Sequence, residues 1–171
     1  ILMILKEYII PLSNLKEGIY EFDFQADDLF FQQYENPEIY GGSIQIHVIL
    51  HRNNTFLELD FQITGTLKIM CDRCLETFDY NINTSENLYV RFGEHFEEIN
   101  DNVIIIPENA FRLDISQYIY EFSALSIPLK KVHPDEGNQR CDPEMIKLLK
   151  DHSGEITEIN PVWEKLRDIL N

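Results

Sequence analysis

The chain has 171 residues, of which 44% are hydrophobic and 26% are charged, a composition typical of a globular protein. Its net charge is −16. This argues against a general binder of nucleic-acid backbones or of anionic membrane surfaces, because both need a basic face. No apolar run approaches the roughly 18 residues that span a bilayer. Three cysteines without an export signal favour reduced thiols, so we expect a cytoplasmic protein that does not associate with membranes.

The acidity is concentrated in the first part of the chain. Residues 1–129 carry a net charge of −14, and residues 130–171 carry −2. We expect residues 1–129 to form a mainly β body with a packed helix near 114–126. Residues 130–171 should form a loop plus two short helices that belong to the same domain.

Alternation of apolar and polar side chains predicts strands through the first half of the chain. The predicted strands cover residues 18–24, 43–51, 56–71, 78–82, 88–92 and 102–106. Asn53-Asn54 is expected to form a hairpin turn, since asparagine tolerates positive φ. Gly65, in the middle of the longest run, predicts a bulge or a bend.

Helical patterns follow these strands. Asp114 can cap a helix with one apolar stripe, made of Ile115, Tyr118, Ile119, Phe122 and Leu125. Asp142-Pro143 predicts a helix that runs to Leu149 or Lys150, and Asn160-Pro161 predicts another. The resulting class is α+β, mainly antiparallel β with a barrel-like or sandwich body, one packed helix and a helical C-terminal tail.

Cys71-Asp72-Arg73-Cys74 is the most distinctive local pattern. Two thiolates at this spacing can bind one tetrahedral zinc ion, or can cycle between dithiol and disulfide. A thioredoxin-type site needs the pair at the N-terminus of a helix, whereas this pair follows a predicted strand. Zinc needs two further ligands, for which His133 and Cys141 are the next candidates. In a third interpretation the cysteines only pack at a strand end.

The remaining polar patterns carry less information. Residues 130–150 have a net charge of +1, which would allow a local anion contact there, with Arg73 nearby if the cysteine segments meet. Its candidate residues are Arg73, Lys130, Lys131 and Arg140. The acidic pairs Asp27-Asp28 and Glu97-Glu98 are expected in solvated loops. No phosphate-binding loop, nucleophile elbow or H-E-x-x-H motif is present, so we expect no catalytic residues.

Three segments together resemble the YceD family of large ribosomal RNA subunit accumulation proteins. The first is the apolar strand that ends in Cys-x-Arg-Cys, within residues 65–78. The second is Leu-x-Ile-Pro-Leu followed by a basic-His-Pro stretch and a cysteine, at residues 125–134 and Cys141. The third is Asn-Pro-Val-Trp-Glu-Lys-Leu at residues 160–166. The resemblance covers about residues 55–170. Many members carry further cysteine pairs after the proline segment, whereas this chain has only Cys141 there.

The resemblance implies a non-enzymatic role in the accumulation or processing of large-subunit ribosomal RNA. It also implies a partner, since members commonly lie beside the gene for a small basic large-subunit ribosomal protein. An acidic body can bind such a protein, or a pre-ribosomal particle, through charge complementarity; direct RNA contact stays open. Two alternatives remain: a β-barrel that binds an apolar ligand or another protein, and a Cys-x-x-Cys redox protein.

Overall fold

The computed structural model describes residues 8–13, 15–34, 38–134 and 140–153. In chain order its elements are β1 (Ile9–Pro11), β2 (Gly18–Ala26), α1 (Asp28–Phe31), β3 (Ile39–Arg52), β4 (Phe56–Met70), β5 (Thr77–Gly93), β6 (Glu97–Asn100), β7 (Val103–Pro107), β8 (Arg112–Asp114), α2 (Ser116–Leu125) and α3 (Pro143–His152).

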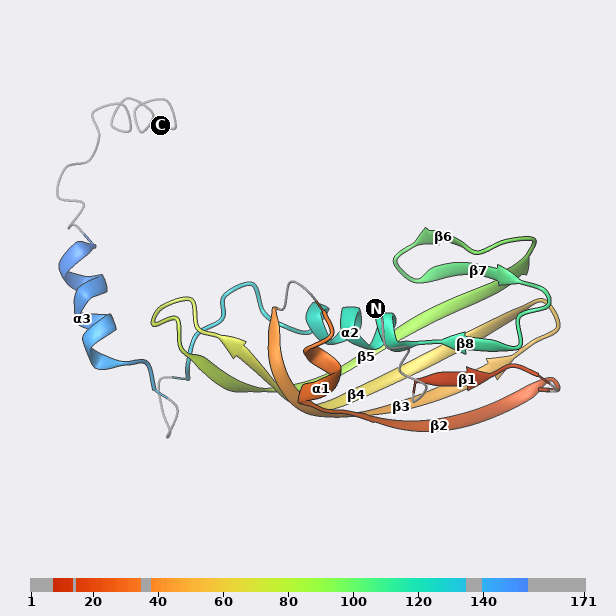
Figure 1. Ribbon diagram of the computed structural model, residues 1–171, viewed down its shortest axis with the longest axis horizontal. Coiled ribbons are helices and arrows are strands. Elements are labelled where there is room, and N and C mark those ends of the chain that lie inside the picture. The colour runs from red at the N-terminus through yellow and green to blue at the C-terminus, as the bar shows by residue number, and fades with distance from the viewer. Residues whose placement is uncertain (1–7, 14, 35–37, 135–139, 154–171) are drawn as a thin grey trace, which may run out of the picture.

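Six strands, of which β2 to β5 are long, form one sheet in the order β2-β3-β4-β5-β7-β6 (Figure 1). All neighbours in it are antiparallel except β5 and β7, which run parallel. Strands β1 and β8 form a separate two-stranded sheet. The predicted mainly antiparallel α+β class is confirmed. The division at residue 129 stays a prediction.

Strands β2, β3 and β5 are longer than the sequence pattern predicted, whereas β4 and β7 agree with it to within one residue at each end. Residues 78–82 and 88–92 belong to one strand, β5, because the polar residues between them keep the same alternation and pair along β4. Asn53-Asn54 does form the turn between β3 and β4, and the Asn53 amide donates to the Phe56 carbonyl at 3.0 Å. At Gly65 the register is unbroken, so no bulge forms there. Gly65 is needed for its φ of +146° and because a Cβ would overlap the Ser43 carbonyl oxygen.

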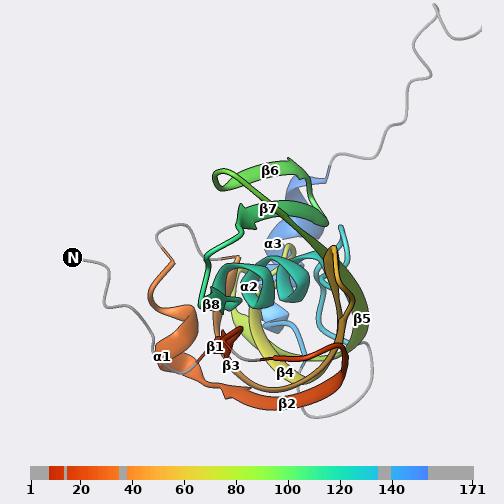
Figure 2. The ribbon, with the colours of Figure 1, turned by 90° about the vertical axis from the view of Figure 1, so that its right-hand side faces the viewer.

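The sheet curves around α2, which packs against its concave face (Figure 2). Tyr118, Ile119 and Phe122 are buried there, and the Phe122 ring meets the Phe61 ring of β4 edge-on at 5.2 Å between centroids. Burying each large apolar side chain contributes about 1.5–3 kcal/mol. Because α2 fills the concave face of the sheet, it occupies the space in which a β-barrel would hold an apolar ligand.

One residue of the predicted apolar stripe of α2 is exposed and not buried. Leu125 is 69% exposed, because the last turn of α2 opens onto a groove. The helix is also not capped as predicted: its N-cap is Ile115, and Asp114 Oδ1 instead accepts from the Ser116 amide at 2.9 Å and hydroxyl at 2.6 Å.

The acidic pairs also differ from the expectation of solvated loops. Asp27 caps α1 by accepting from the Leu29 amide at 3.0 Å, and Asp28 accepts from the Gly42 amide at 2.8 Å. Glu97 and Glu98 are exposed but belong to strand β6. A carboxylate that accepts from a backbone amide holds a turn in place, so the first pair is structural.

Helix α3 begins where the sequence predicted. Asp142 is its N-cap and accepts from the Glu144 amide at 2.9 Å, with Pro143 in the first turn. It ends at His152, two or three residues later than expected. The helix predicted after Asn160-Pro161 lies outside the described residues.

Candidate metal centre

The Cys-x-x-Cys pair lies in the tight connection between β4 and β5. Cys71 directly follows β4, its amide donates to the Glu76 carbonyl at 2.9 Å, and the Leu75 amide donates back to the Cys71 carbonyl at 2.9 Å. Leu75 takes a left-handed conformation, with φ of +62°. The Arg73 amide points at the Cys71 Sγ, 3.5 Å away. The turn therefore directs both thiols inward, and both are buried.

The segment after Pro128 supplies the other two side chains. Asp72 and Lys131 hold it against the turn through two hydrogen bonds: the Asp72 amide donates to the Lys131 carbonyl at 2.7 Å, and the Lys131 amide donates to Asp72 Oδ2 at 2.7 Å. Arg73 Nη2 donates to the His133 carbonyl at 3.2 Å. The His133 ring packs on Phe78, with 4.6 Å between centroids. These contacts bury His133 to 4% exposure.

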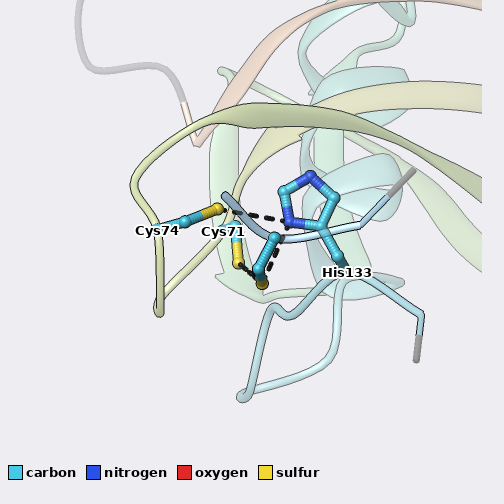
Figure 3. A group of neighbouring side chains, drawn as sticks. Cys71, Cys74 and His133 are labelled. Atoms are coloured by element: carbon cyan, nitrogen blue, oxygen red, sulfur yellow. Dashed lines mark hydrogen bonds between the residues drawn. The ribbon is translucent and has the colours of Figure 1, made fainter. Parts of the chain in front are cut away.

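Four potential ligand atoms converge as a result. Figure 3 shows the side chains of Cys71, Cys74 and His133 pointing toward one another. Together with the half-buried Cys141, their ligand atoms all lie within 4.8 Å of one another. Within the part of the chain that the structure describes, no other group of His, Cys, Asp and Glu converges in this way.

Three of the six separations between these atoms match those around a tetrahedral ion. Zinc–sulfur bonds of about 2.3 Å and zinc–nitrogen bonds of about 2.0 Å place tetrahedral ligands about 3.8 Å apart for two sulfurs and about 3.5 Å apart for sulfur and nitrogen. Cys71 Sγ and Cys141 Sγ are 3.6 Å apart, and His133 Nδ1 lies 3.4 Å from Cys74 Sγ and 3.5 Å from Cys141 Sγ. The buried Cys₃His cluster is thus compatible with a metal such as zinc.

The thiols differ in acidity. Burial opposes ionisation of Cys71, but hydrogen bonds from the backbone amides of Cys74, Arg73 and His133, and from the His133 side chain, outweigh it and lower its pKa to about 6. Burial, together with the neighbouring sulfurs of Cys71 and Cys74, raises the pKa of Cys141 to about 11. Cys71 therefore ionises more readily than Cys141, and a cation would offset the repulsion that opposes ionisation of Cys141.

The predicted anion-contact residues are only partly gathered at this centre. Arg73 and Lys131 contact it as described above, and Lys131 Nζ also lies 4.0 Å from Glu38 Oε2. Lys130 and Arg140 are exposed at either end of the segment. An anion contact by these four residues stays a prediction. Sequence reasoning missed the parts played by Asp72 and Phe78, although an aspartate inside the cysteine turn is a recognisable signal for a backbone-binding side chain.

A family model described as "Large ribosomal RNA subunit accumulation protein YceD" matches residues 59–170. The chain belongs to the YceD family. The match includes all four residues of the Cys₃His cluster and begins within β4, so β1, β2 and β3 lie outside it. No curated protein and no solved structure matches the chain.

Membership of the YceD family implies a role in the accumulation of large-subunit ribosomal RNA. The family is one of ribosome biogenesis factors and is not known for enzymes. None of the helices in the described ranges has both the length and the apolar character needed to cross a membrane.

Proposed function

We propose that this protein is a non-enzymatic assembly factor for the large ribosomal subunit that acts in the cytoplasm through a basic ribosomal protein or a pre-ribosomal particle. The observation that carries the proposal is the YceD family match over residues 59–170. The charge supports a protein partner: a chain of net charge −16 repels naked RNA and attracts the basic proteins that bind RNA.

We further propose that Cys71, Cys74, His133 and Cys141 bind zinc in a structural role. Four protein ligands complete a tetrahedral zinc and leave no position for a reacting water, which distinguishes structural from catalytic sites. The ion would offset the charge of the buried thiolates and link the β4–β5 turn to the segment that carries His133 and Cys141. Zinc would thereby order the connection between the β body and α3.

The assembly role is tested by deleting the gene and measuring the ratio of mature large- to small-subunit ribosomal RNA. A fall in this ratio with accumulation of large-subunit precursors supports the role. An unchanged ratio in the deletion strain refutes it. Complementation with the intact gene is the control that links the defect to this protein.

The zinc proposal is tested by metal analysis of protein purified without chelator. We expect near-equimolar zinc, which is lost in Cys71→Ser and in His133→Gln. His95→Gln is the matched control, because His95 is exposed and lies outside the cluster. Folded wild-type protein that carries no metal would refute the proposal.

A further inference from the structure

A groove of about 930 Å³ lies between α2 and the strands β5, β6 and β7. Its floor is apolar and aromatic, formed by Ile104, Tyr118, Phe122 and Ala124, and Tyr120 and the exposed Leu125 also line it. The Tyr120 ring is held by stacking on Tyr34, with 3.7 Å between centroids. A groove of this volume with an apolar and aromatic floor is typical of a binding site.

Five carboxylates line the same groove: Glu38, Glu86, Glu98, Asp101 and Glu121. No lysine, arginine or histidine is among the described residues that line it. Within the described residues, the oxygens of these five carboxylates do not converge into a metal-ligand group. The negative charge is therefore spread along the groove, which suits a row of cations better than a single ion.

One of the five carboxylates, Glu86, lies on the core face of its strand and not on the outer surface of the sheet. The register places it opposite Phe61, which is itself opposite Val48, so Glu86 is on the face of β5 that forms the core. It is half-buried there, at a position whose strand pattern calls for an apolar side chain. A local break of this kind in a consistent core pattern is expected where a function requires it.

The carboxylates also act on the phenols of the groove. Burial, followed by the charges of Glu98 and Glu121, raises the pKa of Tyr118 to about 12. At one end of the groove, Lys131 Nζ already lies 4.0 Å from Glu38 Oε2. The groove thus has a negative potential, and one of the chain's own cations approaches its rim.

We propose that this groove is the docking site for an arginine- and lysine-rich segment of a protein partner. Guanidinium and ammonium groups would pair with the carboxylates on the rim, while their aliphatic stems and the planar guanidinium face would cover the tyrosines and Leu125. Phosphate-bearing partners are disfavoured by the same five carboxylates. The inference rests on the proposed function, since it locates the surface on which the assembly factor would hold a basic ribosomal protein.

The test uses a short fluorescein-labelled peptide of alternating arginine and alanine, and measures fluorescence anisotropy with the full-length protein. The groove variant is Glu98→Gln with Glu121→Gln. The control variant, Glu17→Gln with Glu21→Gln, makes the same change in net charge at exposed positions on and beside β2. All four positions are exposed or half-exposed, and thermal unfolding verifies that both variants fold.

At about 0.15 M salt, we expect the groove variant to bind the peptide about tenfold more weakly than the wild type, and the control variant to lose less than about twofold. High salt should abolish the difference. Equal losses in the two variants would overturn the proposal, because the peptide would then respond only to net charge. Preferential binding of a single-stranded RNA oligonucleotide over the peptide would overturn it as well.

Complementation of the deletion strain separates this inference from the assembly role. A groove variant that fails to restore the ribosomal RNA ratio, when the control variant restores it, supports the docking site. If deletion lowers the ratio and the groove variant restores it fully, the assembly role stands and the groove has no part in it. If deletion leaves the ratio unchanged, the assembly role itself fails, whatever the peptide does.

Discussion

Replacing Asp72 with alanine tests whether zinc binding and the docking of the segment that carries His133 are one event. Asp72 is not a candidate ligand, yet its Oδ2 accepts from the Lys131 amide at 2.7 Å. The reverse bond, from the Asp72 amide to the Lys131 carbonyl, uses only backbone atoms and survives the substitution. The variant therefore removes one identifiable contact and leaves all four metal-binding side chains in place.

The size of the effect follows from that contact. A hydrogen bond to a charged acceptor contributes about 1.5–3 kcal/mol, and the exposure of Asp72 reduces this to about 1 kcal/mol. If the segment docks only when zinc binds, the whole loss appears in the affinity for zinc. Since about 1.4 kcal/mol corresponds to a tenfold change in an equilibrium constant, we expect the zinc Kd to rise about fivefold.

Competition with a chromophoric zinc chelator measures this Kd directly. Asp101→Ala is the matched control, because it removes an exposed aspartate that lies in the groove and not at the cluster. We expect its zinc Kd to equal that of the wild type. An unchanged Kd in Asp72→Ala would refute the reasoning, since the segment would then be docked equally well without the metal.

Three further outcomes follow from the structure. Burial opposes ionisation of Cys71, but the Cys74 and Arg73 amides, which lie in the β4–β5 turn and not in the segment that carries His133, lower its pKa below the ordinary 9.0 on folding. The unfolded chain therefore binds the extra proton, and metal-free protein should gain stability as the pH rises toward 9. Thermal unfolding measures this gain, and Cys71→Ser should remove it. In urea titrations, Phe122→Ala should lower the free energy of unfolding by about 3–5 kcal/mol, because Phe122 is buried. Leu125→Ala should lower it by less than about 0.5 kcal/mol, because Leu125 is exposed. Gly65→Ala should lower the free energy of unfolding by about 1–3 kcal/mol or more, because the φ of Gly65 and its close contact with β3 both exclude a Cβ. A urea midpoint equal to that of the wild type would contradict this.

The strands were predictable from sequence because their information is local. Apolar side chains alternate along β2, β3, β4 and β5, and alternation with period two is itself the condition for burying one face of a sheet. The Asp142-Pro143 signal likewise located the start of α3, since a capping side chain acts within its own turn. The short elements α1, β1, β6 and β8 were missed, because a few residues carry too little periodicity to stand out.

The groove was not predictable, because no local pattern marks it. Glu86 reads as one polar residue in a polar stretch until the register places it on the core face of β5 opposite Phe61. Leu125 continues the apolar stripe of α2, and it is exposed because the last turn of the helix opens onto the groove. Both assignments depend on which element lies opposite, and pairing between distant segments is decided by the packing of the whole domain.

The amino-acid sequence alone indicates an acidic mainly β chain, a Cys-x-x-Cys turn after a long strand, and motifs that resemble those of the YceD family. It could name His133 and Cys141 only as candidates, because they lie far along the chain from the cysteine pair. Folding brings these side chains together, through the Asp72–Lys131 hydrogen bonds and the packing of His133 on Phe78. Ligand identity is a property of residue type, whereas convergence to within 4.8 Å is a property of the folded chain.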